Sequence, residues 1–150
     1  MTAFTDVFSQ DLIIFNPTSI ENKKTCFELI ASLISQRNPG LNQYELLNAL
    51  YHRELIGCTL VATDIAIPHA RIKNLTAPIG VITKLKRPIP FSADETQTVS
   101  LLFSLFVAQN AQQEHLHILA QLASQLRKST WTEKLLTAKT SEVLWEIFSG

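Results

Sequence analysis

The chain contains four histidines, His52, His69, His115 and His117, and these are the first candidates for chemistry. Imidazole is the side chain whose ordinary pKa lets it change charge near neutral pH, and it serves as nucleophile, general base or metal ligand. His69 follows the β-prone run 65–67 and a proline, which predicts a ring displayed at a strand end beside a loop. Ligand-handling groups of α/β proteins commonly lie there. His52 is predicted near a helix end, where a favourable interaction with the helix dipole accounts for it.

His115 and His117 fall in a segment with helical periodicity. At about 100° per residue, Leu119, Leu122 and Leu126 share one stripe, and His115 lies at its centre. A hydrogen-bonded histidine at the edge of the core and a functional histidine both fit that position. His117 points almost the opposite way, so we expect it on the solvated face. The two rings therefore cannot bind one metal ion from this helix.

The elements that position these histidines can be inferred from the first half of the chain. The apolar run Leu12–Phe15 predicts a strand or an anchoring segment. Thr18 and Glu21 have capping-box spacing, which predicts that a helix begins there. Asn42 predicts the start of a second helix, which should end between residues 53 and 57.

The second half of the chain begins with predicted strands and ends with predicted helices. Residues 65–67 and 79–82 predict short strands, and the nearly continuous apolar run 99–107 predicts a central strand buried on both faces. The prolines in this region favour edge strands and turns: Pro68, Pro78, Pro88 and Pro90. Two or three closing helices are expected, beginning near Asn110, Thr130 and Thr140. Together these elements predict one α/β domain over residues 1–150, with a mixed β-sheet flanked by helices.

Composition restricts the classes of function. Lys plus Arg equals Asp plus Glu, so the formal net charge is zero, and no dense basic run indicates a nucleic-acid partner. No window has the roughly 18 apolar residues of a membrane span, and the N-terminus does not resemble a secretion signal. Cys26 and Cys58 are isolated, which is typical of a cytoplasmic protein without a zinc site or a disulfide framework. We expect a cytoplasmic protein with no metal and no cofactor.

The string Ile65-Ala66-Ile67-Pro68-His69 resembles the signature around the phosphorylated histidine of the phosphotransferase-system enzyme IIA family that includes the fructose–mannitol and nitrogen-regulatory proteins. The resemblance covers about residues 12–148 and is greatest to the nitrogen-regulatory members. Three further landmarks occur in the family's order: Arg53-Glu54 before Gly57 and Thr59, the apolar strand Leu101 to Val107, and Glu114-His115 followed by Leu116, Ile118 and Leu119.

The resemblance implies an enzyme IIA sandwich that accepts a phosphoryl group on His69 from an HPr-like phosphocarrier protein, with His115 facing His69 and Arg53 nearby. It also implies a phosphate loop that contains Thr59, Asp64, Pro68 and Ala70. Phosphoryl transfer between histidines needs alignment and charge stabilisation more than acid–base chemistry, and no metal is required. The implied downstream partners are regulated protein targets or an enzyme IIB.

Two departures from the family pattern affect the expected chemistry. Family members commonly have glycines before the motif and directly after the histidine, where this chain has Asp64 and Ala70. Loss of glycine restricts the backbone, and Asp64 adds a negative charge close to the phosphate site that should repel the incoming phosphate, so we expect slow transfer. A non-catalytic binding module with the same fold and a stand-alone sugar-specific enzyme IIA are the alternative functions. A zinc hydrolase is disfavoured because the chain has no H-E-x-x-H spacing.

Overall fold

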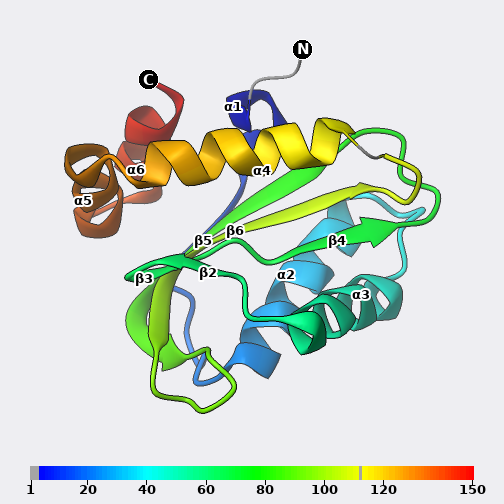
Figure 1. Cartoon of the computed structure of the whole chain (residues 1–150), viewed down its shortest axis with the longest axis horizontal. Helices are drawn as coiled ribbons and strands as arrows, with labels where there is room; N and C mark the ends of the chain where they lie inside the picture. Colours follow the sequence, from blue (N-terminus) through cyan, green and yellow to red (C-terminus); the bar gives the residue numbers. More distant parts are fainter. Residues whose placement is uncertain (1–3, 112) are drawn as a thin grey trace.

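The structure is a computed structural model that describes residues 4–111 and 113–150, with the side chains of residues 113–115 also outside the described part. Figure 1 shows three layers, with α2 and α3 on one face of a β-sheet and α1, α4, α5 and α6 on the other. The elements follow in this order: α1 (Phe4–Val7), β1 (Phe8–Phe15), α2 (Lys23–Arg37), α3 (Gln43–Ile56), β2 (Leu60–Ala62), β3 (Asp64–Ala66), β4 (His69–Ile72), β5 (Ile79–Pro90), β6 (Thr98–Ala108), α4 (Gln113–Leu126), α5 (Ser129–Thr137) and α6 (Ser141–Ser149).

The sheet is six-stranded and mixed, as expected from the sequence. Its strand order is β1-β5-β6-β3-β2, and β4 also pairs with β6. β6 is antiparallel to β5 and parallel to both β3 and β4, so it is the strand that organises the sheet. Its residues Val99–Val107 are all buried, which confirms the prediction of a central strand.

The helical layer of α2 and α3 packs on the sheet through a core that includes Phe27, Ile30 and Leu46. α3 begins where predicted, because the Asn42 side chain accepts hydrogen bonds from the backbone N–H groups of Tyr44 and Glu45.

The predicted start of α2 at Thr18 and Glu21 is wrong. The helix begins four residues later, where Asn22 and Thr25 form the capping box, and the Thr25 N–H donates to Asn22 Oδ1 at 2.9 Å.

The opposite layer packs on the sheet through aromatic side chains. The Phe148 ring of α6 lies 5.5 Å from the ring of Phe103 in β6 and 5.2 Å from the ring of Phe8 in β1. The short helix α1 was not predicted, and it packs against α4 and β1.

Pro88 and Pro90 lie at the end of the long strand β5, beyond Lys84, where the pairing with β1 has ended and only β6 pairs with β5. The prediction of an edge position for these prolines is therefore confirmed, and the register of β5 against β6 also shifts between Lys84 and Ile89. This irregularity accommodates residues that cannot donate a backbone hydrogen bond. Within the described residues, no helix has both the length and the apolar character needed to span a membrane.

Candidate active site

His69 is the first residue of β4 and follows directly on the segment that links β3 to β4. It pairs in register with Leu105 of β6, and the Leu105 N–H donates to the carbonyl of Pro68 at 2.8 Å. Pro68 therefore fixes the entry of the chain into the sheet. The half-buried imidazole is displayed where two short strands meet the central strand, as the sequence predicted.

Two neighbours define the protonation pattern of the His69 ring. Nδ1 lies 2.7 Å from the carbonyl oxygen of Ile67, and the Arg53 Nε–H donates to Nε2 at 3.1 Å. A carbonyl oxygen can only accept and a guanidinium can only donate, so the proton belongs on Nδ1 and the lone pair on Nε2. The structure thus holds a neutral imidazole with Nε2 as its nucleophilic nitrogen.

Electrostatics favours the same neutral form. The pKa of His69 lies below its ordinary value, mainly because burial disfavours the charged imidazolium. The Ile67 carbonyl raises this pKa, the nearby Arg53 guanidinium lowers it and the Glu54 carboxylate raises it, in decreasing order of effect. The net effect keeps His69 neutral, and therefore nucleophilic, at neutral pH.

Arg53 reaches His69 from the last turn of α3. Its Nη1 donates to the carbonyl of Gly57 at 2.8 Å while its Nε contacts the histidine, so the planar guanidinium is held at two points. The sequence prediction that Arg53 lies near His69 agrees with this geometry. The guanidinium is a fixed positive charge beside the nucleophilic nitrogen.

An open pocket of about 440 Å³ lies in front of this pair. It is lined by Ala49, His52, Arg53, Ile56, His69, Ala70 and Arg71. Sequence analysis missed Arg71, whose exposed side chain donates to the Gln109 carbonyl at 3.3 Å. The signal was available, because residues two apart in a strand point to the same face, so Arg71 shares the face of His69.

Thr59 lies beneath the site instead of in contact with the His69 ring. Its buried hydroxyl donates to the Glu54 carboxylate, and its carbonyl accepts from the Ile67 N–H at 2.9 Å. Thr59 therefore supports the strand that carries the histidine.

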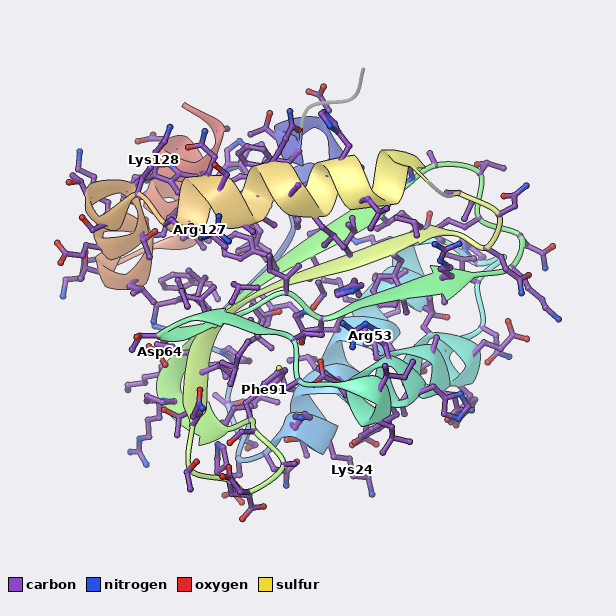
Figure 2. The ribbon with its side chains drawn as sticks, viewed as in Figure 1. Lys24, Arg53, Asp64, Phe91, Arg127 and Lys128 are labelled. Atoms are coloured by element: carbon purple, nitrogen blue, oxygen red, sulfur yellow. The ribbon has the colours of Figure 1, made fainter. Side chains whose placement is uncertain are left out.

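The structure does not bring Asp64 to His69. Asp64 pairs with Val99 and His69 with Leu105, six residues apart on β6. The chain between Asp64 and His69 is extended, which places the two backbones up to about 17 Å apart. Asp64 accepts from the Ser100 hydroxyl, and Figure 2 shows it on β3 well away from Arg53. The expectation that its charge opposes an incoming phosphate is therefore wrong, because the extended strand separates the two residues.

Asp64 and Ala70, which stand where family members commonly have glycine, differ in backbone conformation. Asp64 has φ of 70°, in the left-handed region where glycine is favoured and aspartate is tolerated. Ala70 lies inside β4 in a strand conformation, and its side chain is buried in the core. An alanine at position 70 thus requires no special backbone geometry.

The structure describes the side chain of only one of the two histidines of α4. The side chain of His115 lies outside the described residues. His117 was expected on the solvated face, but it is half-buried, and its Nε2 is buried without a hydrogen-bond partner among the described residues. The unpredicted helix α1 packs against α4, so the surface of α4 away from the sheet is not fully open to water.

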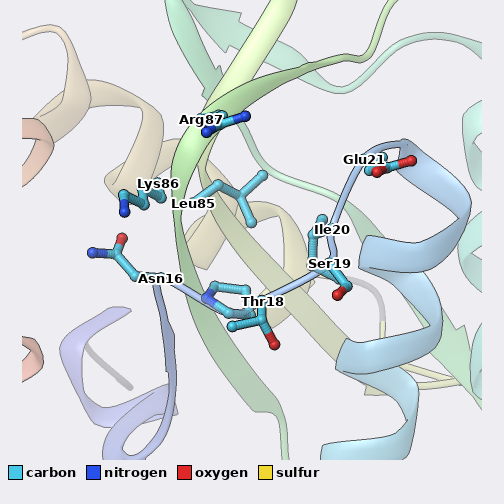
Figure 3. A pocket seen from close by; sticks show the side chains of 9 residues that line it. Asn16, Thr18, Ser19, Ile20, Glu21, Leu85, Lys86 and Arg87 are labelled. Carbon is cyan, nitrogen blue, oxygen red and sulfur yellow. The ribbon is translucent and has the colours of Figure 1, made fainter.

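A second pocket, of about 420 Å³, lies between the loop from β1 to α2 and the strand β5. Figure 3 shows Asn16, Thr18, Ser19, Lys86 and Arg87 around it. None of the residues that line it is a histidine or a cysteine, so it lacks the nucleophile that the His69 pocket has. Among the described residues there is also no cluster of three or more His, Cys, Asp or Glu that could hold a metal ion.

Comparison with known proteins identifies the family of the chain. The family described as "Phosphoenolpyruvate-dependent sugar phosphotransferase system, EIIA 2" matches residues 6–150. The chain is 35% identical to a nitrogen regulatory protein of Pseudomonas aeruginosa over 126 residues, which cover 84% of this chain and 82% of the relative. It is 30% identical to a fructose-specific EIIA component of Haloferax volcanii, over 69% of this chain and 67% of that protein.

Solved structures show the same fold. The nitrogen regulatory protein IIA-Ntr of Neisseria meningitidis superposes with a TM-score of 0.86 at 28% identity, covering 95% of this chain and 97% of that one. The mannitol enzyme IIA of Escherichia coli, in its complex with phosphorylated enzyme IIB, superposes with a TM-score of 0.77 at 16% identity, over 95% and 99% of the two chains. The family match, which spans nearly the whole chain and includes His69 and Arg53, shows that this protein belongs to the phosphotransferase-system enzyme IIA family of the second type.

Proposed function

We propose that this protein accepts a phosphoryl group on Nε2 of His69 from an HPr-like phosphocarrier and regulates other proteins through its phosphorylation state. The observation that carries the proposal is the fixed tautomer, with Nδ1–H on the Ile67 carbonyl and an Nε2 lone pair facing Arg53. A nucleophile in this state needs no general base, because its proton already lies on the other nitrogen.

The transfer step is balanced without a proton acceptor. The Nε2 lone pair forms the new N–P bond as the N–P bond to the donor histidine breaks, and the donor imidazole recovers its electron pair. The proton of His69 stays on Nδ1 throughout and is donated to the Ile67 carbonyl. Arg53 occupies the lone pair in the free protein, so its Nε–H must turn from Nε2 to a phosphoryl oxygen as the donor arrives. The same charge then offsets the phosphohistidine.

His115 is proposed as a second donor to the phosphoryl oxygens. The proposal rests on the family resemblance and on helical spacing, because position 115 precedes the buried Ile118 by three residues and Leu122 by seven. Replacing His115 with Gln should slow transfer about tenfold, less than the full loss of an oxyanion donor, because Arg53 shares the charge. A single-turnover measurement on the H115Q protein tests this role, and an unchanged rate would rule it out.

The surface beside the pocket supports docking of a protein donor. Leu55 and Ile56, at the end of α3, are 82% and 83% exposed, and Ile56 lines the His69 pocket. Contiguous exposed apolar side chains are typical of a protein contact site. The cations Arg53 and Arg71 line the same pocket and complement the negative charge of a phosphorylated donor.

The greater likeness to nitrogen-regulatory proteins favours regulation over sugar transport. Relatives with that name reach 35% identity over 84% of the chain, against 30% over 69% for the fructose-specific component. A stand-alone sugar-specific enzyme IIA is the second candidate, and it would pass the phosphoryl group to an enzyme IIB.

The direct test is incubation with phosphoenolpyruvate, enzyme I and an HPr-like carrier, followed by mass spectrometry under mildly alkaline conditions. We expect one phosphoryl group on the natural protein, none on the H69Q variant and an undiminished amount on the H117Q control. An unlabelled natural protein would support the alternative of a binding module. Label that persists on H69Q would place the acceptor elsewhere.

A further inference from the structure

The last turn of α3 holds the loop beneath His69 through two adjacent residues. Arg53 contacts the Gly57 carbonyl, and the Glu54 carboxylate accepts from the Thr59 hydroxyl two residues further on. The loop between α3 and β2 is thus fixed at both of these points by side chains of opposite charge. The contact of Arg53 with His69 is direct, whereas Glu54 acts at a distance from the ring.

A continuous path of hydrogen bonds leads from Glu54 to the His69 ring. Thr59 donates its hydroxyl to Glu54, and its carbonyl accepts from the Ile67 N–H at 2.9 Å. The Ile67 carbonyl in turn lies 2.7 Å from Nδ1 of His69. Glu54 therefore holds Thr59, and Thr59 holds Ile67, whose carbonyl fixes the tautomer of His69.

Glu54 is itself held by Lys23. The glutamate side chain is 5% exposed, and its Oε2 lies 3.4 Å from Nζ of Lys23, which is 23% exposed. The Lys23 ammonium also lies 4.1 Å from the centre of the Phe91 ring. A buried carboxylate is unfavourable unless it is paired and hydrogen-bonded, and Lys23 and Thr59 supply both conditions. The Lys23–Glu54 pair is neutral as a whole, so it adds no net negative charge near an incoming phosphate.

We propose that Glu54 is a positioning residue for phosphoryl transfer, which acts through Thr59 and Ile67 to keep the proton of His69 on Nδ1 and the lone pair on Nε2. The proposal rests on the proposed function of His69. Glu54 touches neither the ring nor the phosphate in this role. Lys23 and Thr59 are its partners, one fixing its charge and the other carrying its effect to the strand.

The experiment compares T59V with T59S. Valine has the shape of threonine without its hydroxyl, so the Glu54 contact is lost, whereas serine retains it. E54Q and K23M weaken the same arrangement from its other side, and E133Q, on the exposed surface of α5, is the matched control. Circular dichroism confirms that each variant is folded.

The primary measurement is the ¹⁵N NMR spectrum of the His69 ring as a function of pH, which needs no phosphate. We expect the natural protein, T59S and E133Q to show the Nδ1–H tautomer. T59V should show a mixture of tautomers, and E54Q and K23M should show the same loss of the Nδ1–H tautomer by a smaller amount. A His69 spectrum that is unchanged in T59V overturns the proposal. If T59V does not fold, an unchanged spectrum in both E54Q and K23M overturns it.

The second measurement is the single-turnover phosphorylation rate. Misplacement of a reacting atom by a fraction of an ångström is expected to slow transfer by about tenfold in T59V, with recovery in T59S. A slow T59V protein with an unchanged ring spectrum contradicts the role proposed for Glu54. Failure of the natural protein to accept phosphate would contradict the proposed function alone, because the ring spectrum still decides the positioning role.

Discussion

His69 and Asp64 lie five positions apart in the sequence and beside the same central strand, but their surroundings differ. His69 faces an open pocket with Arg53 at its Nε2, whereas Asp64 is bonded to Ser100 at the other end of the β3 to β4 segment. The short strand β3 and the two residues that link it to β4 separate them by up to about 17 Å. The comparison shows that closeness in sequence does not make a single site when the chain between is extended.

The largest effect on the transfer rate is expected at the His69 pocket, when Arg53 is replaced by glutamine. R53Q removes the charge next to Nε2 and the contact with Gly57, so transfer should slow by about 10- to 100-fold. The measurement is single-turnover phosphorylation. R53K keeps a charge without the planar donor pair, and we expect an intermediate rate. A rate for R53Q close to that of the natural protein would show that the phosphoryl charge is met elsewhere.

A charge placed on the docking surface should have the next largest effect. I56E introduces a carboxylate beside the His69 pocket, where it opposes a phosphorylated donor and interrupts apolar contact, so kcat/KM should fall by about tenfold. The free energy of unfolding should change little, because Ile56 is 83% exposed. V143E, on the exposed face of α6, is the control and should leave kcat/KM unchanged. Equal effects in both variants would remove the case for a docking surface.

The protonation of His69 predicts how the site responds to pH. Its pKa is lowered, so the unfolded chain binds a proton at this position more readily than the folded protein does. The free energy of unfolding therefore rises with pH from the folded pKa up to about 6.5, the ordinary value, and this contribution is lost as the pH falls through that window. An NMR titration should give a midpoint below 6.5, and H69Q should lose this part of the pH dependence. A midpoint at or above 6.5 would contradict the neutral nucleophile.

The smallest effect on the transfer rate is expected at Asp64. D64N removes the carboxylate charge but keeps a residue that tolerates the left-handed backbone, where Asp64 has φ of 70°. At up to about 17 Å from His69, the charge lies beyond the screening length of about 8 Å at physiological salt, so the transfer rate should stay within about twofold. Steady phosphorylation rates at two salt concentrations measure this. A rate that rises several-fold in D64N would restore Asp64 to the site.

The sequence predicted those parts of the molecule that depend on local signals. Asn42 capped α3, the apolar run became β6, and the proline before His69 preceded a strand. The start of α2 was placed too early because Thr18 with Glu21 and Asn22 with Thr25 both have capping-box spacing, and only packing selects between them. Periodicity on its own also did not reveal α1, which is four residues long.

The candidate site was predicted in part for the same reason. The motif singled out His69 and the helix end singled out Arg53, and the two side chains meet at 3.1 Å. The distance from Asp64 and the burial of His117 depend on strand register and on the packing of α1 against α4, neither of which the spacing of residues contains. Arg71, by contrast, could have been predicted from the sequence, because strand alternation places it on the same face as His69.

The central claim is that Nε2 of His69 is the phosphate-accepting atom, and the most direct test is NMR of the phosphorylated protein with ¹⁵N-labelled histidine. The H69Q spectrum identifies the ring signals of His69. We expect ³¹P–¹⁵N coupling to Nε2 of His69, with the proton retained on Nδ1. Coupling to Nδ1, or to a nitrogen of His52 or His117, would contradict the account.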